Sequence, residues 1–153
     1  MVEILCDKAK FLAVNTQLNS GNRGYHVINR YSRVDFVSLN EPEIRLANHN
    51  RHDPLEPIME RVSKNLQARW VAVTRGTKGA IIFDREHSKF FEIPSLATKV
   101  IDRIGAGDTF LSLASLCLRD GLSAEVAAFL GSAAAALSVG TVCNSNSVDS
   151  IDL

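Results

Sequence analysis

Two glycines, an alanine and an aspartate stand at residues 105–108, where a helical pattern of apolar residues begins. The first amide groups of a helix have no intrahelical partner and carry partial positive charge, so they attract anions. Small residues let these amides approach a phosphate closely, and an aspartate beside them can take a proton from an attacking hydroxyl. The stretch from Gly105 to Asp108 therefore suits phosphoryl transfer. The alternative is a plain turn in which Asp108 only caps the helix.

Two other stretches place polar residues or glycines at the ends of predicted strands. Asn40 and Glu43 form an N-x-x-E pattern directly after one strand, and Thr74, Gly76 and Gly79 lie between two others. None of these stretches, nor residues 105–108, fits the P-loop pattern GxxxxGK[ST] or the dinucleotide pattern GxGxxG. From the residues alone, Glu43 is better explained as a solvated carboxylate in a first helical turn.

The elements that must position these residues follow from the spacing of apolar side chains. Short apolar runs predict strands at 11–16, 34–39, 70–73, 79–83 and 90–93. Helical spacing predicts helices at 44–47 and 56–68, from about residue 108 to Gly121, and at 124–138 after a Ser123 cap. Strands that alternate with helices predict an α/β fold, a mainly parallel sheet with flanking helices.

Composition and charge restrict the classes of function. The chain has 153 residues, enough for one domain, and its 17 basic residues equal its 17 acidic ones. This balance favours neither nucleic acid nor a membrane surface as a partner. The three cysteines lie far apart without a CxxC pair, which favours a reducing compartment over a disulfide framework or zinc site. We therefore expect a cytoplasmic protein.

The stretches DRIGAGDTF, SLNEPE and VAVTRGTKGAIIFD together resemble the signatures of ribokinase-like (PfkB-type) carbohydrate kinases, in the order that the family has them. The resemblance covers the chain from about Phe11 onward and points to the C-terminal, nucleotide-binding part of the fold. It implies an ATP-dependent phosphotransferase that acts on an alcohol group of a sugar or sugar phosphate. By this resemblance Asp108 is the catalytic base, and the amides of Gly105, Ala106 and Gly107 form the anion hole.

The same resemblance implies ligands for the remaining positions. Asn40 and Glu43 would organise Mg²⁺ and phosphate, largely through water. Asp102 matches a residue that helps to hold a monovalent cation, K⁺, in some members. The residues that would contact the nucleotide ATP or ADP are Thr74, Gly76, Gly79 and Ser132, with Asn40 at the phosphates and Arg75 or Lys78 as further phosphate contacts.

The sequence departs from the family in two respects. Arg103 stands where the family usually has a small residue. Residues 1–153 also resemble a single partial kinase domain, in which the N-terminal sugar-binding and lid half is absent. We therefore expect little or no activity from the chain alone, and a homodimer or another association through an exposed sheet edge. The alternative function is a non-catalytic nucleotide-binding or structural module that pairs with another subunit.

Overall fold

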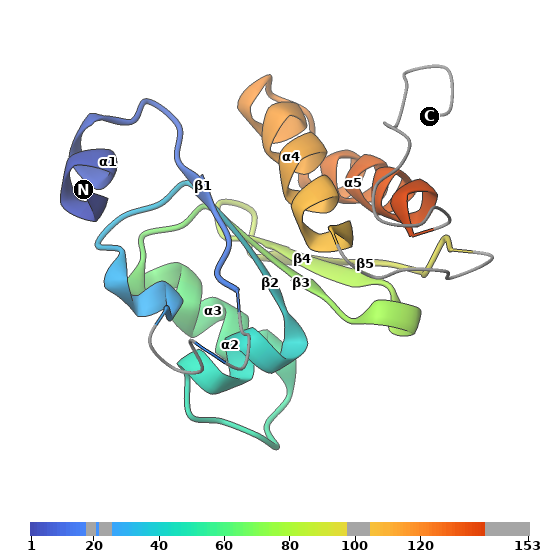
Figure 1. Ribbon diagram of the computed structural model, residues 1–153, viewed down its shortest axis with the longest axis horizontal. Helices are drawn as coiled ribbons and strands as arrows, with labels where there is room; N and C mark the ends of the chain where they lie inside the picture. The colour runs from blue at the N-terminus through green and yellow to red at the C-terminus, as the bar shows by residue number, and fades with distance from the viewer. Residues whose placement is uncertain (18–20, 22–25, 98–104, 140–153) are drawn as a thin grey trace.

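The computed structural model describes residues 1–17, 21, 26–97 and 105–139. Within them the chain forms a five-stranded sheet with helices on both faces (Figure 1). The strands are β1 (Ala13–Val14), β2 (Phe36–Asn40), β3 (Trp70–Thr74), β4 (Ala80–Asp84) and β5 (Lys89–Ile93). The helices are α1 (Val2–Lys8), α2 (Glu41–Ala47), α3 (Leu55–Asn65), α4 (Ala106–Arg119) and α5 (Ala124–Ser138), with short 3-10 turns η1 (Ile28–Arg30) and η2 (Gly76–Lys78).

The strands lie in the order β1-β2-β3-β4-β5. β1, β2 and β3 pair in parallel, whereas β4 is antiparallel to both β3 and β5. β5 therefore runs in the same direction as β1 to β3, and β4 alone runs the other way. The predicted α/β class and its mainly parallel sheet are confirmed.

Two separate apolar cores cover the two faces of the sheet. Successive side chains of a strand point to opposite faces, so Phe36 packs with α4 and α5 while Val37 packs with the residues of α2 and α3. The same alternation runs through the buried residues of β3 and β4. Figure 1 shows α4 and α5 above the sheet, and α2 and α3 below it. No helix in the described ranges is long and apolar enough to cross a membrane.

The predicted helices are present with small changes at their ends. α2 begins at Glu41 rather than Ile44, because Asn40 caps it and Pro42 fits its first turn. α5 begins after Ser123, whose hydroxyl accepts a hydrogen bond from the amide of Val126 at 3.3 Å, as predicted. The strand predicted at 11–16 is shorter, since only Ala13 and Val14 pair with β2.

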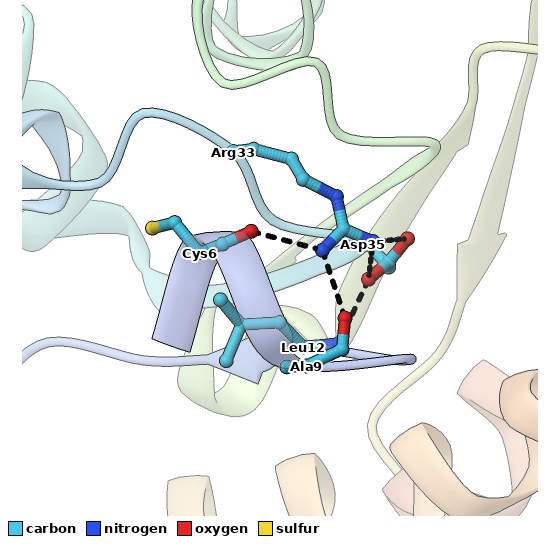
Figure 2. Close-up of polar contacts among 5 residues, drawn as sticks. All are labelled: Cys6, Ala9, Leu12, Arg33 and Asp35. Carbon is cyan, nitrogen blue, oxygen red and sulfur yellow. Dashed lines mark hydrogen bonds and ion pairs between the residues drawn. The ribbon is translucent and has the colours of Figure 1, made fainter. Parts of the chain in front are cut away.

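The N-terminal helix α1 was not predicted, and contacts from distant residues hold it in place (Figure 2). The Arg33 guanidinium donates hydrogen bonds to the carbonyl oxygens of Cys6 and Ala9, at 3.3 and 3.0 Å. It also donates to both carboxylate oxygens of Asp35, at 2.9 and 2.8 Å, and Asp35 accepts a further bond from the amide of Leu12 at 2.8 Å. Through these hydrogen bonds, Arg33 and Asp35 hold the C-terminal end of α1 next to the start of β1.

Replacing Arg33 with alanine is expected to release α1 while the sheet stays folded. Hydrogen bonds to a charged group contribute about 1.5–3 kcal/mol each when buried, and this site is partly exposed, so we expect a loss of about 1–2 kcal/mol. Hydrogen exchange of residues 2–12 measures the change. Arg33→Lys keeps the charge but not the planar fork, in which one terminal nitrogen donates to the two carbonyls and the other donates to Asp35, so protection should fall in this variant also. Unchanged protection in both variants would show that apolar packing, of Cys6 with Val2 and Ala9, holds the helix without Arg33.

Candidate active site

A cavity of about 750 Å³ lies where β2 and β3 end and α4 begins. Asn40 and Thr74 are register partners at the carboxyl ends of two parallel strands, so they reach this cavity side by side. Crevices at the carboxyl ends of parallel strands are the usual ligand sites of α/β sheets. Eight residues that the sequence predicts for the site line the cavity: Asn40, Thr74, Arg75, Gly76, Gly79, Ala106, Gly107 and Ser132.

The start of α4 faces this cavity with its backbone. Gly105 is the N-cap, in the left-handed conformation with φ 84°, and its carbonyl oxygen accepts the first helical bond from the amide of Thr109 at 2.9 Å. The amides of Ala106 and Gly107 have no partner among the described residues. The alternative in which Asp108 caps the helix is therefore wrong, because Gly105 holds that position and Asp108 lies three residues further on.

Asp108 is exposed in the first turn of α4 and contacts a residue that sequence reasoning missed. Asn15, the first residue after β1, donates a hydrogen bond from Nδ2 to Oδ1 of Asp108 at 2.8 Å. The two residues are 93 positions apart. One feature of the sequence could have pointed to Asn15. It lies near the carboxyl end of the predicted strand 11–16, and functional side chains of α/β sheets gather at such ends.

Asn40 and Glu43 form a reciprocal capping box at the start of α2. The amide of Glu43 donates to Oδ1 of Asn40 and the amide of Asn40 donates to Oε2 of Glu43, both at 2.8 Å. Such a pair satisfies two orphan amides of a helix start. Glu43 therefore has a structural role in the first turn of α2, where it helps to cap the helix. Asn40 takes part in the same capping box and also lines the cavity. The described residues include no cluster of three or more acidic, histidine or cysteine side chains that could hold a metal ion.

The loop between β3 and β4 forms another wall of the cavity. The amide of Arg75 donates to the carbonyl oxygen of Gly79 at 2.7 Å and closes the loop. Gly79 has φ 79° and ψ −142°, a conformation that only glycine adopts readily. The Arg75 side chain lines the cavity and pairs with Glu92 at 3.3 Å, whereas Lys78 is not among the lining residues. Asp102 and Arg103 lie outside the described residues.

The family model that matches the sequence is that of the pfkB family carbohydrate kinases, over residues 2–150. The chain belongs to the pfkB family of carbohydrate kinases. Among curated proteins, the bifunctional protein HldE of Histophilus somni is 32% identical over 127 residues, which make up 81% of this chain and 26% of that protein. The ribokinase of Arabidopsis thaliana is 31% identical over 108 residues, 69% of this chain and 28% of that protein. The chain thus spans between a quarter and a third of the length of these relatives.

Solved structures of the pfkB family share the fold. The chain superposes on Arabidopsis thaliana ribokinase complexed with ribose and ATP with a TM-score of 0.73 at 23% identity, covering 92% of this chain and 45% of that one. It superposes on Escherichia coli phosphofructokinase-2 in complex with potassium with a TM-score of 0.76 at 17% identity, covering the same two shares. Both comparisons establish the fold, and both show that the neighbours extend well beyond the part seen here.

The charges around the cavity suit the anionic ligands of a pfkB-family kinase. Its described lining includes three arginines, Arg45, Arg51 and Arg75, and a single carboxylate, Glu41. Glu41 pairs with Arg45 at 2.9 Å and Glu92 pairs with Arg75 at 3.3 Å, so of the three arginines Arg51 alone has no carboxylate partner in the described part of the chain. The other end of the cavity is formed by α5 and residues 94–97. This end is apolar, with Leu96, Ala136 and Val139 among the lining residues. One end thus favours phosphate, and the other favours a flat apolar group.

Proposed function

We propose that the chain carries the nucleotide site and catalytic base of an ATP-dependent phosphotransferase that acts on an alcohol group of a sugar or sugar phosphate. One observation carries the proposal: at the start of α4, Ala106 and Gly107 line the cavity, their amides have no partner among the described residues, and Asp108 follows them directly. Donors for a phosphoryl group and a carboxylate base therefore stand on one rigid helical turn. Membership of the pfkB family of carbohydrate kinases supports a phosphotransferase activity of this kind.

In this proposal Asp108 accepts the proton of the acceptor hydroxyl as its oxygen attacks the γ-phosphorus of ATP. A new P–O bond forms to the acceptor while the bond from the γ-phosphorus to the bridging oxygen breaks, and ADP leaves with that electron pair. The amides of Gly105, Ala106 and Gly107 donate hydrogen bonds to the charge that develops on the transferred group. Oriented donors of this kind lower the barrier because they need no reorganisation during the step.

The nucleotide lies along the cavity in the proposed complex. Thr74, Gly76 and Gly79 contact it from the loop after β3, and Arg75 provides a positive charge for its phosphates. Ser132 and the apolar residues of α5 form the wall for the adenine.

Oxygen atoms of Asn40 and Glu43, with phosphate and water, form a donor set that suits Mg²⁺. When bound, this ion would neutralise phosphate charge, and the capping box would orient the two side chains. For Asp102 we propose the K⁺ role that the resemblance implies.

We further propose that residues beyond this chain complete the sugar site. β1 is an edge strand of two residues, and Asn15 and Asp108 meet at its end. A segment or second copy that pairs with this edge would stand next to the base, where an acceptor must bind. The proposal therefore includes an association through β1, as a homodimer or with a longer partner, in the cytoplasm and without nucleic acid.

Calorimetric titration with ATP and Mg²⁺ tests the nucleotide site in the chain as it stands. We expect saturable binding that adenosine alone reproduces only weakly, because most contacts go to phosphate. Asp108→Asn should retain this binding and should lower phosphoryl transfer to sugars or sugar phosphates by about 10²–10⁴-fold, the usual contribution of a general base. Absence of binding would reject the proposal. Binding without transfer in any preparation would favour the non-catalytic module.

A further inference from the structure

A second, smaller cavity is lined by Asn15, the residue that donates a hydrogen bond to Asp108. Its volume is about 130 Å³, and its lining includes Asn15, Thr16, Gln17 and Tyr31. Asn15 therefore contacts this cavity while its amide donates to Asp108. On the other side, Ala106 and Gly107 of the same helical turn line the nucleotide cavity. Asp108 itself lines neither cavity, but its hydrogen-bond partner Asn15 lines the smaller one and its neighbours Ala106 and Gly107 line the larger one.

The backbone before Asn15 is held firmly. Ala13 and Val14 pair with Phe36 and Val37 of β2, and Val14 is buried. The Asp35 carboxylate holds the amide of Leu12, two residues before Val14 (Figure 2). Asn15 therefore projects from a fixed point at the sheet edge, whereas Asp108 is an exposed side chain that would otherwise sample several rotamers.

The hydrogen bond between the two side chains has no competitor in the part of the chain that the structure describes. Nδ2 of Asn15 donates to Oδ1 of Asp108, and neither side chain has another partner there. The side-chain amide of Asn15 is neutral. It can therefore fix the orientation of the Asp108 carboxylate without neutralising its charge, whereas a lysine or arginine would neutralise it. It also has no proton to exchange with the base at ordinary pH.

We propose that Asn15 is the positioning residue for Asp108. It occupies Oδ1 and so directs Oδ2 to the acceptor hydroxyl, whose carbon chain enters from the small cavity that Asn15 lines. The cavity is smaller than the roughly 300–1,000 Å³ of a complete small-molecule site, so it holds only the reacting end of the acceptor. This inference rests on the proposed function, because it gives Asp108 the role of base.

The side-chain rotamer of Asp108 is the direct readout and needs no turnover. Three-bond NMR couplings of Asp108 should report one rotamer in the wild-type chain and averaged values in Asn15→Ala. The side-chain amide signals of Asn15 should move toward those of a free amide in Asp108→Ala. Asn29→Ala is the matched control, because it also removes a 2.8 Å amide hydrogen bond, to the carbonyl oxygen of Ala47. This control should leave the couplings of Asp108 unchanged.

Kinetics test the catalytic consequence in the chain associated with the residues that complete the sugar site, because the chain alone is expected to have little activity. We expect Asn15→Ala to lower kcat at least tenfold with the KM for ATP within twofold, and Asn15→Asp to be at least as impaired despite its similar shape. Averaged couplings already in the wild type, or unchanged couplings in Asn15→Ala, would overturn the inference. If the wild type binds no ATP, the proposed function fails. If it binds ATP while Asn15→Ala behaves like Asn29→Ala, only the role of Asn15 fails.

Discussion

Replacing Gly79 with alanine is expected to destabilise the fold by at least about 3 kcal/mol. Gly79 has φ 79° and ψ −142°, and holding a residue with a side chain in such a region costs of order 1–3 kcal/mol. A Cβ atom there would lie 2.0 Å from the carbonyl oxygen of Ile93 and 2.7 Å from the carbonyl carbon of Pro94. Both are backbone atoms at the end of β5, so the contact cannot be relieved by a change of rotamer.

Urea denaturation of the two variants Gly79→Ala and Gly76→Ala measures this effect with an internal control. Gly76 also has a positive φ, 60°, but a Cβ atom there meets nothing within 4 Å. Gly76→Ala should therefore lower the free energy of unfolding only by the cost of placing alanine in a left-handed backbone conformation, about 1–2 kcal/mol. Equal losses of stability in the two variants would contradict the close approach of this loop to the segment after β5. Residues 94–97 line the larger cavity, in which we propose that ATP binds, so Gly79→Ala should also weaken ATP binding.

The sequence predicts the β-strands well because each is a short run of β-branched or aromatic residues between polar residues. Trp70–Thr74 is one residue longer than the predicted 70–73 and Ala80–Asp84 is shifted by one residue from 79–83, whereas β1 keeps only two residues of the predicted 11–16. Side-chain periodicity and local caps are properties of neighbouring residues, so they can be read without the fold. α5 begins and ends where its Ser123 cap and apolar pattern indicate.

The features that the sequence did not predict depend on contacts between distant residues. α1 has few buried residues of its own, and Arg33 holds its carbonyl groups from 24 to 27 positions away. The contact between Asn15 and Asp108 joins an edge strand to a helix start, and no local pattern encodes it. The capping box of Asn40 and Glu43 is different, because its spacing of three is visible in the sequence and could have been predicted.

Replacing Gly107 with alanine should change stability and nucleotide binding in opposite directions. Gly107 is exposed in the first turn of α4, and a Cβ atom there meets nothing within 4 Å. Alanine is the better helix former, so we expect a gain of up to about 1 kcal/mol in the free energy of unfolding. The new methyl group would project from the turn whose amides face the cavity, and it would hold a phosphate away from them.

Hydrogen bonds to a charged group contribute about 1.5–3 kcal/mol each, so loss of one should weaken ATP binding roughly 10- to 100-fold. Thermal unfolding and calorimetric titration of Gly107→Ala measure the two effects on one preparation. Ser115→Ala is the control, because it raises helix propensity on α4 at a position that does not line the cavity. It should leave ATP binding unchanged. A Gly107→Ala variant that is more stable and binds ATP as tightly as the wild type would show that the phosphate does not approach this turn, and the anion hole would then have to lie elsewhere.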